Sequence, residues 1–427
     1  MSRWFSQHVG GLLALILFEC AIQALAITTQ FHGKELPNST STSLHRKGKI
    51  LSFMNIVRFD NTACVGTARL GICYTAAECE ARGGRTTNTC AQGYGVCCIF
   101  SLGCGTTSAE NCTYFEPVGT INPGSCTHTI CPCSSDICQM RLDFLLFDIT
   151  GPSTRTESIG TFRGGQIAAE GVQYSVATQC LTDIFSVTSS SGINPPSICG
   201  VNTNEHMYVD AGDGCNDLVF QIGEVARGNT IPARQWAIKI SQFSCDYNNL
   251  APPGCTQYFF NSDSGVVRSY NYDNAQSRHL ADQQQVVCVR REQARCRICW
   301  SAPEKTGVSV NGLINDRGIV SPDICCAYNM NDAMEVKGYD CISIPGAVAA
   351  GTLTPVPERV CGIRGLVTAN GNDYVPICSV SEPFQIRFNS DSYEATSDGE
   401  AISEEAEVLG PNTGFELNYA LSNDNCS

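Results

Sequence analysis

The chain has 427 residues, a formal net charge of −14 and only 16% charged residues. This acidic balance disfavours nucleic acid and other polyanions as partners. No segment after residue 26 is apolar for the ~20 residues that a membrane-spanning helix requires. The 27 cysteines are more than a cytosolic protein would keep reduced. These features exclude a nucleic-acid binder, a membrane-spanning protein and a cytosolic enzyme.

The N-terminal segment has the three parts of a secretory signal peptide. Arg3 supplies a positive charge, and residues 11–26 form an apolar stretch that ends in Ala24-Leu25-Ala26. We therefore predict that residues 1–26 are removed and that the protein is secreted and extracellular. Cys20 leaves with this leader, and the remaining 26 cysteines are an even set, as disulfides in an exported chain require.

Residues 27–52 are polar and basic, contain no cysteine and predict an exposed leader or linker. They include the sequon Asn38-Ser39-Thr40, and a second formal sequon is Asn111-Cys112-Thr113. We predict glycosylation at Asn38 and consider Asn111 a further candidate.

Residues 53–100 predict a small disulfide knot, because so short a segment cannot close much of a hydrophobic core. The cysteine order C-x8-C-x5-C-x10-C-x6-CC resembles the clip domain of arthropod serine-protease zymogens. The resemblance implies a module that docks or regulates proteases without being catalytic. The cysteines are Cys64, Cys73, Cys79, Cys90, Cys97 and Cys98.

Residues 104–250 predict a β-sandwich. Residues 141–149 are apolar on both faces, as in a buried strand. Two later segments alternate apolar and polar side chains, so each has one buried face. The apolar positions are Leu218, Phe220 and Ile222 in one segment, and Trp236, Ile238 and Ile240 in the other.

Four motifs in this region resemble those of CUB domains. They are Cys112-Thr-Tyr-Phe, Cys138-Gln-Met-Arg-Leu-Asp-Phe, Asp183-Ile-Phe-Ser-Val and Ile198-Cys-Gly200. The resemblance implies a jelly-roll sandwich with the bridges Cys112–Cys138 and Cys180–Cys199. It also implies a role in extracellular binding.

The same landmarks recur in residues 255–427. Cys255-Thr-Gln-Tyr-Phe, Asp340-Cys-Ile-Ser-Ile and Val360-Cys-Gly362 match three of the four motifs. We interpret this segment as a second, diverged CUB-like domain and thus as an internal repeat. The repeat implies that all 26 cysteines pair within their own module. The further expected bridges are Cys215–Cys245, Cys255–Cys288, Cys341–Cys361 and Cys378–Cys426.

The two copies differ in the loop before the last strand. Residues 223–235 form it in the first copy, whereas the longer segment 389–414 forms it in the second. The longer loop is acidic and has no Lys or Arg. It is interpreted either as a solvated, mobile loop or as a recognition loop for a basic partner or a cation.

Two stretches resemble protease motifs but lack residues that the chemistry needs. Thr75-Ala-Ala-Glu-Cys79 places Glu78 where trypsin-like proteases require a histidine as general base. Ser262-Asp-Ser-Gly-Val266 lacks two glycines of the nucleophile motif. We therefore predict that the protein is not an enzyme.

Many CUB domains bind calcium through a Glu and two Asp, because a hard cation prefers clustered carboxylate and carbonyl oxygens. The resemblance places Asp183 at the family's strand-start acidic position, and Asp340 at the same position in the repeat. The family's upstream Glu has no clean equivalent; Glu116 is nearest. Asp183 is therefore a calcium candidate, and the alternative is a strand-end carboxylate that is bonded to backbone. No other cofactor is expected.

The sequence thus predicts an all-β protein with two CUB-like jelly-roll sandwiches after a clip-like knot. The expected function is non-enzymatic binding of an extracellular protein or glycan, in a proteolytic or immune cascade. The alternative function is a structural component of extracellular matrix or cuticle, in which rigidity itself is the function.

We expect cleavage after Ala26 and a glycan on Asn38, because both signals are expected to lie in exposed, unstructured sequence. N-terminal sequencing of secreted material and a mass shift on deglycosylation test this. Secreted protein that still begins at Met1 would contradict the prediction.

Overall fold

The structure is a computed structural model that describes residues 58–59, 61–163, 166–224, 234–273, 278–303, 307–310, 340–361, 376–390, 394–395 and 413–424. Side chains are described for these residues except 153–178 and 394–395. The chain divides into two compact units. Unit 1 comprises Met1–Ser101 and Glu110–Tyr114, and unit 2 comprises Leu102–Ala109 and Phe115–Ser427. The predicted signal peptide, Asn38 and most of the acidic loop lie outside the described residues.

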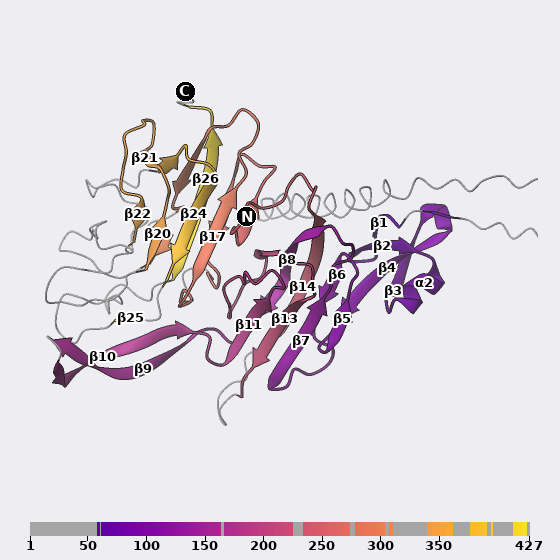
Figure 1. Cartoon of the computed structure of the whole chain (residues 1–427), viewed down its shortest axis with the longest axis horizontal. Coiled ribbons are helices and arrows are strands. Elements are labelled where there is room, and N and C mark those ends of the chain that lie inside the picture. The colour runs from indigo at the N-terminus through magenta and orange to yellow at the C-terminus, as the bar shows by residue number, and fades with distance from the viewer. Residues whose placement is uncertain are drawn as a thin grey trace, which may run out of the picture. The chain divides into compact units, whose positions relative to one another are not determined.

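Unit 1 contains a small antiparallel sheet and one short helix (Figure 1). Its strands lie in the order β1 (Ala63–Val65), β2 (Leu70–Tyr74), β4 (Gly95–Leu102) and β3 (Arg85–Cys90), with a 3₁₀ turn at Ala91–Gly93. Helix α2 (Ala76–Ala81) begins after Thr75, whose hydroxyl accepts a hydrogen bond from Glu78 N. The Glu78 carboxylate accepts one from Thr75 N in return. Glu78 therefore completes a capping box, which explains the protease-like motif without protease chemistry.

The six cysteines of the predicted knot pair among themselves, as Cys64–Cys97, Cys73–Cys90 and Cys79–Cys98. The last bridge is fully buried beside Phe100. A Cβ on Gly84 would lie only 2.2 Å from Sγ of Cys98, so the bridge requires glycine there. The disulfides thus form most of the interior, as the shortness of the segment predicts.

Sandwich 1, the first sandwich of unit 2, consists of two antiparallel layers with one parallel pair. One layer has the order β11 (Asp183–Thr188), β13 (Asn216–Ile222), β7 (Gly124–Ile130) and β5 (Thr106–Ser108), in which β5 and β7 are parallel. The other contains β14 (Gln235–Ser244), β8 (Ile137–Asp148) and β12 (His206–Asp210). In the chain, strand β6 (Thr113–Phe115) lies between β5 and β7.

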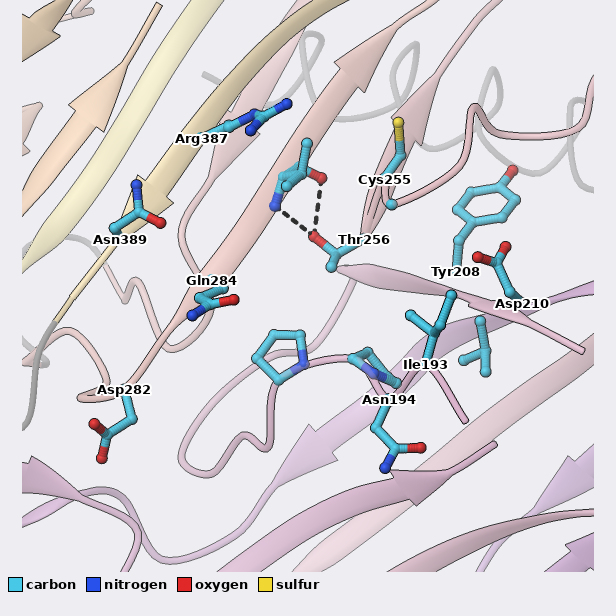
Figure 2. Close-up of a pocket in the computed structure, with 15 residues that line it drawn as sticks. Ile193, Asn194, Tyr208, Asp210, Cys255, Thr256, Asp282, Gln284, Arg387 and Asn389 are labelled. Carbon is cyan, nitrogen blue, oxygen red and sulfur yellow. Dashed lines mark hydrogen bonds between the residues drawn. The ribbon is translucent and has the colours of Figure 1, made fainter. Parts of the chain in front are cut away.

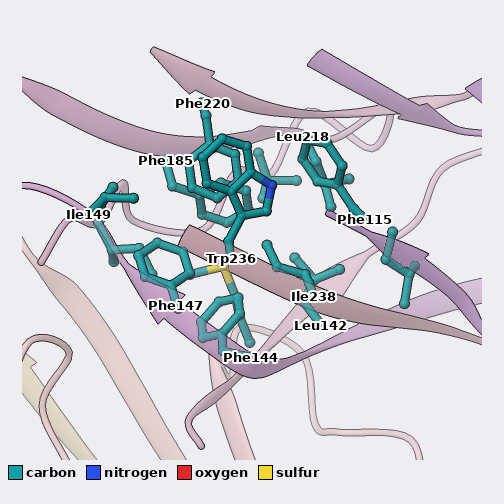
Figure 3. Packing of buried hydrophobic residues seen from close by; sticks show 14 of the residues in the cluster. Phe115, Leu142, Phe144, Phe147, Ile149, Phe185, Leu218, Phe220, Trp236 and Ile238 are labelled. Carbon is teal, nitrogen blue, oxygen red and sulfur yellow. The ribbon is translucent and has the colours of Figure 1, made fainter. Parts of the chain in front are cut away.

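Aromatic side chains fill the space between these layers (Figure 3). Trp236 stacks on Phe220, with ring centroids 3.9 Å apart. Both rings come from the alternating positions that the sequence predicts as buried, and both are almost fully buried. Strand β8 contains residues 141–148 of the segment predicted to be buried on both faces, but Leu145 is 39% exposed. The predicted core of the first sandwich is therefore confirmed.

Sandwich 2 repeats this architecture. One layer has the order β15 (Gln257–Phe259), β17 (Gln284–Val289), β24 (Phe384–Asn389), β20 (Cys341–Ser343) and β22 (Arg359–Val360). The other has the order β16 (Ser264–Arg268), β26 (Gly414–Ser422), β18 (Arg297–Ser301), β23 (Ile377–Ser379) and β21 (Ala347–Ala349). Strand β19 (Val308–Ser309) also pairs with β26.

Strand order supports the internal repeat. The parallel pair of β5 and β7 has its counterpart in the parallel pair of β15 and β17. The antiparallel backbone pairing of Phe185 with Ile198 has its counterpart in the pairing of Ile342 with Val360. The Cys-Gly landmark of each copy therefore follows a residue that pairs with the strand-start segment.

The hairpin of β9 (Ser153–Arg163) and β10 (Gln166–Gln179) is an addition to this plan. Sequence analysis did not predict it. Strand β10 also pairs antiparallel with β25 (Glu394–Ala395), which lies within the predicted acidic loop. Within the described residues, no helix is long and apolar enough to cross a membrane.

Two bridges predicted for sandwich 1 are wrong. Cys138 pairs with Cys245 and not with Cys112, because the start of β8 lies beside the end of β14, where Ile137 pairs with Ser244. Cys215 pairs with Cys131, because these residues flank the paired positions Asn216 and Ile130 of β13 and β7. Cys104–Cys126 is a further bridge, and Cys180–Cys199 is confirmed.

In sandwich 2, Cys255–Cys288 is confirmed. Cys378 pairs with Cys299 and not with Cys426, because the two residues face each other directly on β23 and β18. Cys341 and Cys361 are both disulfide-bonded, but the described bridges do not join them to each other. Cys426 lies outside the described residues. Each described bridge joins cysteines of one predicted module.

We expect peptide mapping of unreduced protein to find the bridges Cys138–Cys245 and Cys131–Cys215. Strand register brings these residues together, whereas the family-based pairing does not follow it. The measurement is mass spectrometry of proteolytic fragments before and after reduction. A fragment that joins Cys112 to Cys138 would contradict the register.

Candidate functional site

The two sandwiches of unit 2 share a buried apolar contact. Its side chains come from both sandwiches: Tyr208 and Phe243 from the first, and Tyr258, Phe260 and Cys288 from the second. In addition, Tyr270 and Leu280 of sandwich 2 belong to the core cluster of sandwich 1. Separation of the sandwiches would expose these apolar surfaces to water, at a cost proportional to their area.

Hydrogen bonds fix the orientation of the two sandwiches at this contact. Tyr208 N donates to Thr256 O (2.8 Å), and Tyr258 N donates to Nε2 of His206 (3.0 Å). A ring nitrogen that accepts carries no proton, so His206 is neutral. Burial, together with the Arg141 guanidinium, lowers the pKa of His206 to about 3. The contact is therefore insensitive to protonation of this ring near neutral pH.

Glu205 is the ionisable group of the contact that titrates near neutral pH. Its Oε2 accepts a hydrogen bond from Nε2 of Gln257 (2.9 Å), and Nη1 of Arg268 lies 3.8 Å from its Oε1. Burial raises the pKa of Glu205 to about 7, although Arg268 and Gln257 act in the opposite direction. The neighbouring His206 carbonyl accepts a hydrogen bond from the Tyr270 hydroxyl (3.0 Å).

A cleft of about 370 Å³ lies between the sandwiches at this contact (Figure 2). Its volume falls in the range of small-molecule binding sites. Sandwich 1 supplies residues 193–196 and 208–210, and sandwich 2 supplies residues 254–256 and the ends of β17 and β24. Seven of the 15 lining residues have polar or charged side chains other than tyrosine: Asn194, Asp210, Thr256, Asp282, Gln284, Arg387 and Asn389.

The loop of sandwich 1 that lines the cleft is held by its own hydrogen bonds. Ser189 N donates to Oδ1 of Asn194 (2.8 Å), and Ser190 N donates to Oδ1 of Asn216 (2.9 Å). A Cβ on Gly212 would lie 2.7 Å from the Ser190 backbone, so glycine permits the close approach. The loop presents Ile193, which is 61% exposed, beside the cleft. Such a loop loses little conformational entropy on binding.

The opposite wall is one face of a sheet. Gln284 pairs with Asn389 and Val286 pairs with Arg387 across β17 and β24, so all four side chains lie on the same face. The Thr256 hydroxyl donates to Val286 O and accepts from Val286 N, which ties the adjoining segment to this wall (Figure 2). The arrangement offers amides, a hydroxyl and a guanidinium to a ligand.

Of the residues that line the cleft, the sequence motifs include Cys255 and Thr256, and Asn389 begins the longer acidic loop. Cys255 is bonded to Cys288 and acts structurally. The signals that could have found the cleft are the Ser-rich segment before Pro195-Pro196 and the polar alternation in β24. Both are ordinary in β proteins, and only the packing of the sandwiches brings them together.

Asp183 does not have the surroundings of a calcium ligand. It is fully buried, and its two carboxylate oxygens accept from Nε and Nη2 of Arg234, both at 2.8 Å. Its oxygens also accept from the N and Oγ1 of Thr150 and from Gly223 N. A guanidinium occupies the position where a cation would bind, so the calcium assignment is corrected to a buried ion pair.

The matching Asp340 has a histidine as its partner instead of an arginine. Its Oδ2 lies 3.0 Å from Nε2 of His279, and both side chains are buried. Among the described residues, no group of three or more His, Cys, Asp or Glu side chains could hold a metal ion. Within the described residues, the strand-start carboxylate thus lies beside a nitrogen-bearing side chain in both copies.

Asn111 stays a predicted glycosylation site. Its side-chain oxygen accepts from Cys112 N (2.8 Å), and Thr113 of the sequon is fully buried. Any glycan on Asn111 would have to be attached before this segment folds.

We expect Glu205→Gln to stabilise the protein at pH 8 by about 2 kcal/mol, and not to do so at pH 4. The raised pKa means that the folded state binds the Glu205 proton more tightly than the unfolded state does. Wild-type stability is therefore lost as the pH rises from about 4.5 to about 7, whereas glutamine does not ionise. Chemical denaturation across this pH range measures the effect.

The matched control is Glu382→Gln, which removes an exposed carboxylate paired with Arg291. Exposed pairs contribute little, so its stability should follow the wild type at each pH. A difference between Glu205→Gln and wild type that does not vary with pH would contradict the prediction.

One segment of the chain matches a known family. Residues 252–422 match the family model of the animal CUB domain. No curated protein matches the chain.

Among solved structures, the chain is similar to the CUB1-EGF-CUB2 domains of rat MASP-1. Identity is 12%, the match covers 74% of this chain and 99% of that one, and the TM-score is 0.21. The chain matches the CUB1-EGF-CUB2 domain of human MASP-1/3 with the same identity and TM-score. That match covers 73% of this chain and 100% of the human chain. The chain is also similar to the full extracellular region of zebrafish Gpr126/Adgrg6, with 10% identity and a TM-score of 0.21. That match covers 76% of this chain and 34% of the zebrafish chain. The segment that folds as sandwich 2 thus matches the animal CUB domain, and the protein has a disulfide-rich, all-β structure over its described residues.

Proposed function

We propose that this is a secreted, non-enzymatic binding protein that holds an extracellular protein or glycan in the cleft between its sandwiches. The observation that carries the proposal is the origin of the cleft walls. Sandwich 1 and sandwich 2 each supply part of the lining, and the contact beside the cleft is buried and hydrogen-bonded. The two sandwiches therefore offer one pre-organised site, which lowers the entropic cost of binding.

The chemistry of the lining supports binding without catalysis. Among the described residues that line the cleft there is no histidine, and Cys255 is held in a disulfide. Nucleophilic catalysis needs a nucleophile beside a base that can take its proton. Glu78 supports the same proposal from unit 1, because its carboxylate caps helix α2.

The disulfides and the CUB domain support an extracellular location, since such bridges persist in oxidising compartments. We further assign unit 1 the role of docking the protein within an extracellular proteolytic or immune cascade. The support for this role is the resemblance of its cysteine order to arthropod clip domains. The six cysteines close on themselves, as an independent docking module requires.

The test is whether filling the cleft removes binding. Asn389→Trp places a large ring in the cleft from an exposed position on β24. We expect this variant to be secreted normally and to lose at least tenfold in affinity for partners that the wild type captures from extracellular fluid. The affinities would be measured by surface plasmon resonance on the captured material.

The control is Leu353→Trp, which changes a 51% exposed side chain away from the cleft and should bind as the wild type does. Equal binding by both variants would place the site elsewhere. Wild-type protein that captures nothing and assembles into insoluble polymers would favour a structural matrix component.

A further inference from the structure

Arginine and lysine side chains in the described part of unit 2 mostly have a carboxylate partner. The pairs are Arg141–Asp143, Lys239–Asp143, Arg234–Asp183, Arg268–Glu416, Arg290–Glu292, Arg291–Glu382 and Arg295–Asp263. In a chain with a net charge of −14, such neutralisation is expected. An exposed arginine that has no ion-pair partner among the described residues is therefore informative.

Arg387 and Arg359 are two such residues. Both are exposed, and neither makes an ion pair within the described part of the chain. Glu358, which precedes Arg359, accepts a hydrogen bond from Gly346 N instead. Within the described part of sandwich 2, two guanidinium groups thus face solvent without an ion-pair partner.

Sheet register places these two arginines on one face. Arg387 on β24 and Arg359 on β22 both pair with Ser343 of the intervening strand β20. Directly paired residues share a face, and strands lie about 4.8 Å apart, so the two arginines are spaced by about 10 Å. The buried neighbours Ile386, Phe388 and Val360 point to the other face, into the core.

The same face forms the wall of the cleft. Arg387 lines the cleft, and Asn389 and Gln284 continue the wall as a directly paired couple of amides (Figure 2). A ligand in the cleft would therefore meet amide and hydroxyl groups together with the carboxylates of Asp210 and Asp282. If it extends across β24 toward β22, it would meet two cationic groups in succession.

We propose that the cleft and the arginine face bind an acidic glycan, a sugar chain that carries carboxylate or sulfate groups. Guanidinium groups bind carboxylate and sulfate through paired charge-assisted hydrogen bonds. Side-chain amides both donate to and accept from sugar hydroxyls. This proposal rests on the proposed binding function and names the class of ligand.

The backbone beside the cleft favours a glycan over an acidic peptide. Peptides that bind along a sheet gain affinity from main-chain hydrogen bonds at an open strand edge. Here the edge of β12 is closed, because Tyr208 N donates to Thr256 O and Thr256 N donates in turn to Val286 O. What the wall offers is side chains, with which a glycan can bond without a backbone partner.

The test measures binding of the whole secreted protein to four soluble probes by isothermal titration calorimetry. The probes are sulfated dextran, carboxymethyl dextran, uncharged dextran and polyglutamate of matched length. The variants are Arg387→Gln, Arg359→Gln and the double variant. The control is Arg291→Gln, which changes the net charge equally but removes an exposed arginine paired with Glu382.

We expect at least one anionic dextran to bind, and uncharged dextran and polyglutamate to bind at least tenfold more weakly. Each single variant should weaken binding about tenfold and the double variant about a hundredfold, as charge-assisted contacts contribute. The control should be unchanged. The two dextran derivatives show whether sulfate or carboxylate is preferred, and thermal melts verify that the variants fold.

Equal loss in the Arg291→Gln control, or equal binding of polyglutamate, would show unspecific charge attraction and overturn the proposal. Binding of no probe, or equal binding of uncharged dextran, would overturn it as well. Because Asn389→Trp tests the cleft with captured partners, the proposed binding function can survive such a result.

Discussion

The buried contact between the sandwiches is the constraint on which the candidate site depends. Tyr208 N bonds to Thr256 O, and the neutral ring of His206 accepts from Tyr258 N. These bonds lie within an apolar cluster, where an unpaired polar group would be costly. The contact therefore holds only in one register, and that register sets the walls of the cleft.

The buried acidic residue at the start of one strand has a different partner in each sandwich. A buried acidic residue begins β11 in sandwich 1 and precedes β20 in sandwich 2, and burial of a lone carboxylate is unfavourable. Sandwich 1 pairs Asp183 with Arg234, whereas sandwich 2 places His279 beside Asp340. In both copies the carboxylate therefore lies beside a nitrogen-bearing side chain of the protein itself. We therefore propose that unit 2 binds its partner at the cleft between the sandwiches and not at the strand ends.

The charge distribution supports the same view. Most described basic side chains of unit 2 are consumed by ion pairs, and Arg387 and Arg359 remain exposed on one sheet face. In a strongly acidic chain, a small region of opposite sign gains selectivity, since long-range repulsion disfavours anions that cannot reach both arginines. A rigid loop that presents Ile193 closes the other side of the cleft.

Sequence alone determined the elements whose cause is local. Alternation at Phe220 and Trp236 predicted buried strand faces, and the six-cysteine spacing predicted a self-contained knot. Tertiary structure decided the rest. The partner of Cys138 depends on which strand ends lie side by side, and cysteine spacing carries no such information. The ion-pair partner of Asp183 is Arg234, which lies 51 residues away in the chain, so only the tertiary structure brings the two together. The cleft exists only because two sandwiches, each predictable from periodicity, pack at one angle that periodicity does not encode.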